Sequence, residues 1–228
     1  MVAHPPLCHA RLCHTLYAIV RHPSLARPHT RATLNTPSSP SRTMATITLS
    51  TAAPLTGLSK RTLWRRVTDG QLHLQGDASL GDHARVLLEE ILPLSRLKLE
   101  PEDFALLLDA DAGQAEAQCD LALEFLMQKM PAEAVQWFKA AARQHYPEAL
   151  HQLGRCHIAG MGVEPDEAHG IALITRAASL GHTTATHLVH YLTNPTRPRL
   201  PPAELEAKLD AIEQKVVLSV LHETADPA

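Results

Sequence analysis

The sequence has few aromatic residues and no long hydrophobic run. Only 4% of its 228 residues are Phe, Trp or Tyr, whereas alanine and leucine are abundant. This composition favours helices that pack closely through small side chains. No stretch approaches the roughly 20 apolar residues that a membrane-spanning helix needs, so we expect no membrane partner. The four cysteines are too few for a dense disulfide scaffold. Two of them, Cys119 and Cys156, lie in helical patterns, which indicates buried thiols in a reducing compartment such as the cytoplasm.

Acidic side chains are absent from residues 1–43, which are rich in arginine, histidine and proline. No period of 2 or 3.6 is sustained there. We therefore expect a disordered tail, or an extension translated from a start codon upstream of a native one at Met44. An Arg-rich, acid-free composition is also typical of an organellar transit peptide, but the prolines work against the helix such peptides form. The stretch CHARLCH, Cys8 to His14, offers thiolate and imidazole groups for zinc. No second ligand cluster completes that set, so no metal site is expected there.

Charge is divided unevenly over the rest of the chain. Residues 44–99 contain seven Lys or Arg and five Asp or Glu, whereas residues 100–228 contain nine and nineteen. This asymmetry predicts a small basic head on an acidic body. Any nucleic-acid contact is expected from the head alone.

Serines and glycines mark out two short helices in the head. Ser50 is a candidate cap for a helix through TAAPL, and Ser59 is a candidate cap for a second helix over residues 60–69. Gly57 allows a tight turn between them, and Gly70 can end the second helix in left-handed geometry. Two helices joined in this way form a helix-turn-helix.

The second of these helices has one apolar and one basic side. Leu63 and Val67 continue an apolar stripe, and long cationic side chains project from the opposite side. A helix that reads DNA needs this division, because Arg and Lys contact phosphates and guanine edges while the other face is buried. The candidate DNA-binding residues are Ser59, Lys60, Arg61, Arg65 and Arg66.

The order of residues in the head resembles the helix-turn-helix of the MerR and excisionase families. The matching positions are Ala53, Gly57, Leu58, Ser59, Thr62, Leu63, Gly70 and Leu72. The resemblance implies a β-hairpin wing, with strands over 72–75 and 84–87, followed by a short helix to Leu92. Three features depart from these families: Asp77 and Asp82 make the turn of the wing acidic, Trp64 stands where a solvent-facing polar residue is common, and no long coiled coil follows. The alternative is therefore a head that only packs, with its cations on a solvated face.

The acidic body contains a repeat. AEAQCDLALEFL from Ala115 resembles PEALHQLGRCHI from Pro147, 32 residues later, and TTATHLVHYL from Thr183 restarts the pattern 36 residues after that. AEAVQWFKAAARQHY from Ala132 likewise resembles AHGIALITRAASLGH from Ala168, 36 residues later. A period in the mid-thirties with two helices per copy is typical of an α-solenoid. The expected fold is mainly α: an α-solenoid of about two and a half helix-pair repeats, with a small N-terminal winged helix-turn-helix.

The repeated residues are similar to Sel-like repeats, relatives of the tetratricopeptide repeat. The second copy matches the family pattern at Ala149, Leu153, Gly154, His157, Gly160, Gly162, Val163, Asp166, Ala177, Ala178, Gly181 and His182. Gly170 stands where Ala is usual and is expected to loosen its helix. The first copy lacks the Gly-x-Gly-Val loop, and the third is truncated. The resemblance implies a concave surface that takes a protein or peptide. We expect Trp137, Tyr146 and Arg155 as exposed partner-binding candidates; helix packing is the alternative for each, and the favoured one for Trp137.

Further helices are expected at both ends of the repeats. PEDFALLLDADAG predicts a helix that closes the N-terminal end. PAELEAKLDAIEQKVVLSVL carries an apolar stripe that predicts a C-terminal capping helix, or alternatively the seam of a homodimer. The expected organisation is thus a tail over 1–43, the head over 44–99, the solenoid over 100–193, and a linker with the capping helix over 194–228.

No set of residues suited to catalysis stands out. The chain has fifteen histidines, and His187 and His190 are spaced i, i+3, but no carboxylate or cysteine is placed in sequence to complete a metal site. There is no phosphate-binding glycine loop and no nucleophile–base pair. We expect no catalytic residue, metal or cofactor. The expected function is a non-enzymatic adaptor, coupled to double-stranded DNA through the head; the alternative is a protein scaffold whose head does not bind DNA.

Overall fold

The computed structural model describes residues 45–75 and 84–225 of the chain. The N-terminal tail, its CHARLCH stretch and the turn of the expected wing lie outside the described residues. The chain divides into two compact units at the Ala112–Gly113 junction. We call the described residues up to 112 the head unit and those from 113 the repeat unit.

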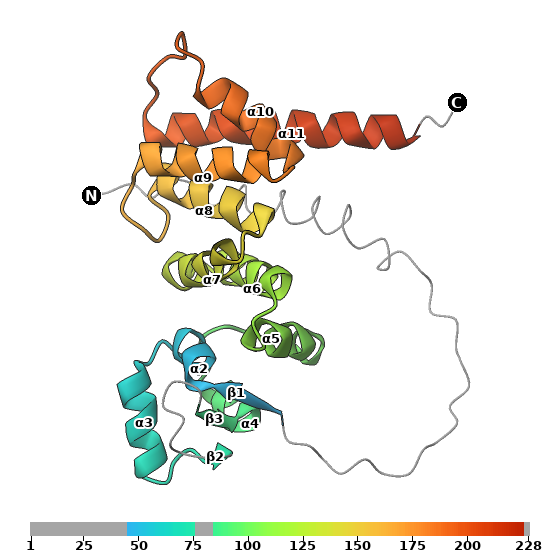
Figure 1. Cartoon of the computed structure of the whole chain (residues 1–228). Helices are drawn as coiled ribbons and strands as arrows, with labels where there is room; N and C mark the ends of the chain where they lie inside the picture. Colours follow the sequence, from blue (N-terminus) through green and yellow to red (C-terminus); the bar gives the residue numbers. More distant parts are fainter. Residues whose placement is uncertain (1–44, 76–83, 226–228) are drawn as a thin grey trace. The chain divides into compact units, whose positions relative to one another are not determined.

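The head unit combines a small antiparallel sheet with short helices (Figure 1). Its sheet has the order β1-β3-β2, so the first strand pairs with the third. In chain order the elements are β1 Thr46–Thr48, α2 Leu49–Thr56, α3 Lys60–Thr68, β2 Leu74–Gln75, β3 Arg85–Leu87, α4 Leu88–Ile91 and α5 Phe104–Asp111, with 3₁₀ turns over Leu92–Leu94 and Pro101–Asp103. The sequence indicated β2, β3 and α4 but gave no sign of β1, which is three residues long and directly precedes a helix.

Side-chain caps fix where the first two helices begin. Ser59 is confirmed as the N-cap of α3, because its hydroxyl accepts a hydrogen bond from the Thr62 amide at 3.1 Å. The expected cap of α2 was wrong: Thr48, not Ser50, accepts from the Thr51 amide. Between the helices, Gly57 has φ of +68°, a conformation that glycine adopts without steric cost. Leu63 on α3 is completely buried, which confirms the apolar side of that helix.

Helix α5 belongs to the head unit rather than to the repeats. The Asp111 side chain, fully buried, accepts hydrogen bonds from the Thr48 amide at 3.0 Å and the Thr48 hydroxyl at 2.7 Å. It also forms an ion pair with Arg85 at 2.7 Å. These bonds tie α5 to β1 and β3. The sequence instead placed this helix with the solenoid, at its N-terminal end.

The repeat unit is a stack of helix pairs, consistent with an α-solenoid (Figure 1). The pairs are α6 Ala115–Met127 with α7 Pro131–Arg143, and α8 Pro147–Ala159 with α9 Glu167–Ser179. Helix α10 Thr183–Leu192 corresponds to the first helix of a third pair and packs on α9. The long helix α11 Pro202–Ala225 follows it. Asp166 caps α9 by accepting from the His169 amide at 2.9 Å, as expected. No helix among the described residues is long and apolar enough to cross a membrane.

Two glycines set the close crossing of α8 and α9. A Cβ atom added to Gly154 would lie 2.8 Å from the Gly170 carbonyl oxygen, and one added to Gly170 would lie 2.7 Å from the Gly154 carbonyl oxygen. These carbonyl oxygens belong to the backbone of the other helix, so a side chain at either position would push α8 and α9 apart. Gly170 was expected to loosen its helix, but the close contact gives it a packing role that this expectation did not include. The glycine allows the two helix backbones to touch.

Helix α11 lies against the first helices of two successive pairs. It contacts α8 and α10, and its Leu205 and Leu209 are buried. Further along, Leu218 is 52% exposed. The first helix of each pair lines the same face of such an array. Helix α11 therefore covers part of the concave surface that was expected to bind a partner.

Candidate partner, nucleic-acid and ligand sites

The cations of α3 lie on the exposed side of the helix. Arg61 and Arg65, one turn apart, are exposed, and Arg66 is half-buried. Among the described residues, no ion pair involves the guanidinium groups of these three arginines. An open hollow on this side of α3 is lined by Arg61, Thr62, Trp64, Arg65 and Thr68. The side chain of Ser59 is already used as the helix cap, whereas Lys60 is exposed.

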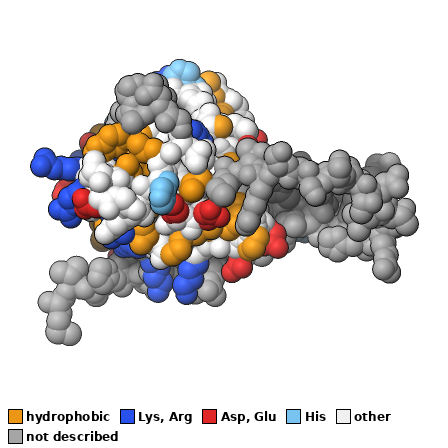
Figure 2. Space-filling model, turned by 90° about the horizontal axis from the view of Figure 1, so that it is seen from below, with side chains coloured by type: hydrophobic (Ala, Val, Ile, Leu, Met, Phe, Trp, Pro, Cys, Tyr) orange, Lys and Arg blue, Asp and Glu red, His pale blue; other side chains and the backbone are white. Residues whose placement is uncertain are grey.

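Basic side chains do not form one continuous surface in the view of Figure 2. They project in separate groups, with acidic and hydrophobic side chains between them. This view therefore shows no broad basic face.

The structure corrects two of the three expected partner-binding positions. Trp137 is 7% exposed and Arg155 is 9% exposed, so neither lies on an open surface. Trp137 lies on the buried side of α7, which agrees with helix packing, its favoured alternative. Tyr146, at the N-cap of α8, is half-buried and keeps its position at the surface.

Arg155 holds α11 against α8. Its guanidinium binds Glu206 through two nitrogens, at 2.5 and 3.3 Å, and Asp210 at 2.6 Å. It also donates to Glu213. The three carboxylates are spaced i, i+4 and i+7 along α11, so they lie on one side of that helix. Together they raise the pKa of Arg155 well above its ordinary value against the opposing effect of burial.

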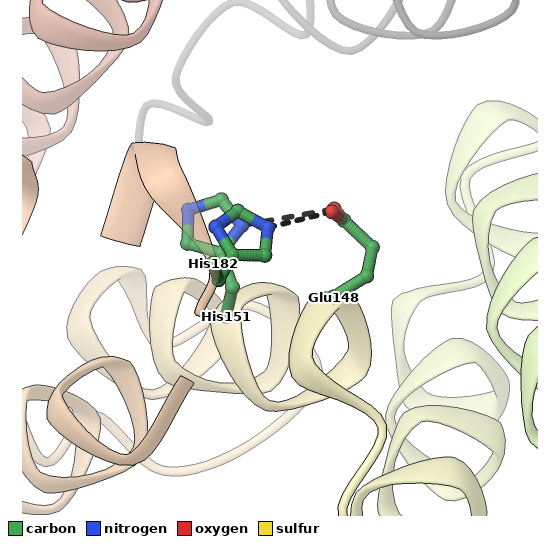
Figure 3. A group of neighbouring side chains, drawn as sticks. All are labelled: Glu148, His151 and His182. Atoms are coloured by element: carbon green, nitrogen blue, oxygen red, sulfur yellow. Dashed lines mark hydrogen bonds and ion pairs between the residues drawn. The ribbon is translucent and has the colours of Figure 1, made fainter. Parts of the chain in front are cut away.

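A second group of polar side chains lies beside this one, formed by Glu148, His151 and His182 (Figure 3). Glu148 and His151 are one turn apart on α8, and His182 is the N-cap of α10. His182 Nε2 lies 2.7 Å from Glu148 Oε2, and the two imidazole centroids are 4.6 Å apart. His151 Nε2 lies 3.0 Å from Glu213 Oε1, which links this group to the Arg155 cluster.

One nitrogen in this group has no hydrogen bond among the described residues. His151 Nδ1 is buried, and it lies 3.7 Å from Glu148 Oε1, which is ion-pair distance but beyond a hydrogen bond. Figure 3 shows the two imidazoles one above the other, both beside the Glu148 carboxylate.

Burial and mutual attraction act in opposite directions on the charges of this region. Burial acts to lower the pKa of His151, but Glu148 and Glu213 outweigh it and raise that pKa from 6.5 to about 9. Burial acts to raise the pKa of Glu213, but Arg155 and His151 lower it to about 2. The pKa of Glu148 is likewise held well below its usual range by His151 and His182, against the effect of burial. The carboxylates are thus ionised at neutral pH.

The cysteines of the repeats are buried thiols. Cys119 and Cys156 are both buried, as their helical patterns predicted. Burial raises the pKa of Cys156 from 9.0 to about 12, so its thiolate is scarce at neutral pH.

Part of the Glu148 group could be recognised from the sequence. The Glu-x-x-His spacing of Glu148 and His151 places both on one side of a helix, but it was not singled out. His182 was assigned only a structural position in the repeat. The i, i+3 spacing of His187 and His190 had suggested that pair as possible metal ligands instead, and both residues are exposed on α10.

Comparison with known families agrees with the geometry of the repeat unit. No curated protein and no solved structure matches the chain. Residues 115–146 and 147–182 match the Sel1 repeat, and these boundaries enclose the pair α6/α7 and the pair α8/α9. The helix α10 and the head unit lie outside the matched residues. The chain thus contains two consecutive Sel1 repeats, a module that implies protein–protein interaction and that is generally a scaffold without enzymatic activity.

Proposed function

We propose that the chain is a non-enzymatic adaptor whose repeat unit binds a protein partner and whose head unit binds double-stranded DNA through α3. The Sel1 repeats support the protein-binding half of this proposal. The DNA-binding half is supported by one observation above the others: Arg61 and Arg65 lie exposed one turn apart on the side of α3 opposite the buried Leu63.

The partner-binding surface proposed here is the part of the repeats that α11 leaves uncovered. Helix α11 contacts α8 and α10, so the first helix of the first pair, α6, and the half-buried Tyr146 remain the candidates. Arg155 serves the internal contact with α11 and is not proposed for a partner. A solenoid of two pairs offers a small surface, which suits a short peptide segment.

The head is proposed to contact DNA through α3 as the second helix of a helix-turn-helix. Its arginines are long enough to reach phosphate oxygens or the guanine edge in the major groove. Lys60, Arg66 and the N-cap Ser59 flank them at the start and on the side of the helix. One head contacts only a short site, so sequence-specific reading needs a second copy of the chain or a second protein.

Fluorescence anisotropy of a labelled DNA duplex tests the DNA-binding half. The full chain is titrated at several salt concentrations beside Arg61→Ala/Arg65→Ala. The matched control is Lys139→Ala/Arg143→Ala, which removes two exposed cations with the same i, i+4 spacing from α7. If each arginine neutralises one phosphate, the slope of log K against log salt concentration falls by up to about 2 in the α3 variant. It stays unchanged in the control.

Equal loss of DNA binding in both variants would mean that binding depends on net charge alone, and would contradict a specific role for α3. Absence of binding by the unsubstituted chain would leave a protein scaffold only. The protein-binding half is tested separately by crosslinking at position 146, with Tyr146 replaced by a photoreactive amino acid. Crosslinks to a partner support it, and an absence of crosslinks from that position and from the exposed side of α6 contradicts it.

A further inference from the structure

The Nδ1 nitrogen of His151 has no hydrogen bond within the described part of the chain and lies 3.7 Å from the Glu148 carboxylate. His151 is 3% exposed, and a buried nitrogen without a hydrogen bond is costly in a folded protein. One ligand atom from each of Glu148, His151 and His182 can be chosen so that all three lie within 4.8 Å of one another. Two imidazoles and a carboxylate are a donor set that suits zinc and related divalent transition metals.

We propose that Glu148, His151 and His182 form a binding site for a divalent transition-metal ion, with zinc as the best match. In a tetrahedral zinc site, ligands about 2.1 Å from the ion lie roughly 3.4 Å from one another. His182 Nε2 lies 2.7 Å from Glu148 Oε2, and His151 Nδ1 lies 3.7 Å from the other oxygen, Oε1. The three ligand atoms lie within 4.8 Å of one another, so the side chains have to rotate to reach the tetrahedral spacing. Three protein ligands leave the fourth position of the ion for water.

The surroundings of His151 favour its Nδ1 atom as a ligand. Glu148 and Glu213 favour the protonated ring at neutral pH, so an ion has to displace one proton from His151. Because Nε2 lies 3.0 Å from Glu213 and keeps its proton for that bond, the lone pair freed in this way is on Nδ1, the nitrogen nearer Glu148. Metal-binding histidines commonly donate their other N–H to a carboxylate, which fixes the ring and strengthens the ligand. Glu213 is itself held by Arg155. The ring of His151 is therefore oriented before any ion arrives.

His182 is the ligand that has to change its hydrogen bonds. Its Nδ1 accepts from the Ala185 amide at 3.0 Å and caps α10. Its Nε2 therefore carries the proton that points to Glu148. Binding an ion through Nε2 requires the other tautomer, with the proton on Nδ1, and this tautomer releases the Ala185 amide. Metal binding and a loosened first turn of α10 are thus coupled.

Calorimetry and cobalt absorption test the site in the full chain. The protein carries Cys8→Ser and Cys13→Ser, which remove the thiols of the N-terminal tail from competition. ZnCl₂ is titrated at constant pH, because protons compete with metals for the same ligand atoms. CoCl₂ is added in parallel, since tetrahedral cobalt gives strong visible absorption. The expected result is one ion per chain and a cobalt spectrum that zinc abolishes.

Variants separate this site from adventitious binding by surface histidines. Glu148→Gln and His151→Asn are expected to weaken zinc binding at least tenfold. The orienting role of Glu213 is tested by Glu213→Gln, which is expected to weaken it about 10- to 100-fold. The matched control, His187→Gln/His190→Gln, removes the exposed pair of α10 and is expected to leave the affinity unchanged. Circular dichroism checks that each variant is folded.

The Ala185 amide gives a readout that does not depend on any variant. Zinc is expected to shift its amide resonance and to increase its hydrogen-exchange rate, because the cap bond is lost. Failure of the unsubstituted chain to bind zinc or cobalt would overturn the proposal. Loss of binding in the control variant, or full affinity in a folded Glu148→Gln protein, would also overturn it.

Discussion

Replacing Arg155 with methionine should release α11 from the repeats. The substitution keeps much of the apolar stem but leaves Glu206, Asp210 and Glu213 facing one another, with side chains 19%, 14% and 9% exposed. Removing one partner of a buried ion pair costs about 3–5 kcal/mol. Glu206 and Asp210 can turn toward water, whereas Glu213 is less able to do so, so we expect the lower end, about 3 kcal/mol.

Urea unfolding followed by Trp137 emission measures this loss in the repeat unit. Trp64→Phe in every variant removes the signal of the head unit, so the transition reports the repeats alone. Hydrogen exchange of the α11 amides shows whether that helix has detached. A cost below about 1 kcal/mol, together with unchanged α11 protection, would refute the role assigned to Arg155.

A compensating variant tests the electrostatic origin of the effect. Adding Glu206→Gln, Asp210→Asn and Glu213→Gln to Arg155→Met removes the repelling charges. Replacing a complete buried ionic group by neutral side chains is often nearly neutral in stability. Most of the lost stability should therefore return. No recovery would mean that Arg155 acts mainly through packing of its stem.

Three further predictions concern other parts of the chain. Gly162→Ala should destabilise the repeat unit more than Gly70→Ala destabilises the head unit. Both glycines have φ near +70°. The new Cβ at position 162 would lie 2.3 Å from the Pro131 carbonyl oxygen, whereas a Cβ at position 70 would have no atom within 4 Å. The open site should lose about 1–2 kcal/mol in thermal unfolding. Asp111→Ala should cost the head unit about 2 kcal/mol, measured by Trp64 fluorescence in urea, because it removes the hydrogen bonds that a buried carboxylate accepts from the half-buried Thr48. A loss under about 0.5 kcal/mol would contradict this. The pKa of His157 is lowered, by burial first and by neighbouring cations second, so the folded chain binds fewer protons there and loses stability as the pH falls from about 7 to 5. His157→Gln should reduce that pH dependence, and an unchanged profile would contradict the assignment.

The repeats could be predicted because their signal is periodic and local. The spacing of Ala115, Pro147 and Thr183 defines the helix pairs without any tertiary information. Asp166 is a residue type that caps helices, so the start of α9 could be predicted from it. The close crossing of α8 and α9 was not predicted: Gly170 was expected to loosen its helix, and Gly154 was recognised only as a match to the repeat pattern. The crossing depends on which sides of α8 and α9 meet, and one helix alone does not contain that information.

The candidate metal site and the Arg155 cluster depend on contacts between distant segments. Arg155 meets residues 51 to 58 positions away on α11, so its place inside the fold follows from where α11 lies. An arginine in a helix pattern is ordinarily exposed, which is why it was expected at the partner surface. His182 meets Glu148 across 34 positions, and only the stacking of α10 on α9 brings the two together.

The position of α11 also determines how long the array can be. A stack of identical helix pairs has no intrinsic end, because each pair offers the next one the same apolar surface that it received from the one before. Here α10 begins a third pair, and α11 then runs back across α8 and α10 instead of completing it. Its own Leu205 and Leu209 occupy apolar surface near that terminus. A chain shortened at residue 193 would leave this surface open to another copy. We therefore expect chains shortened in this way to associate head to tail rather than simply to unfold.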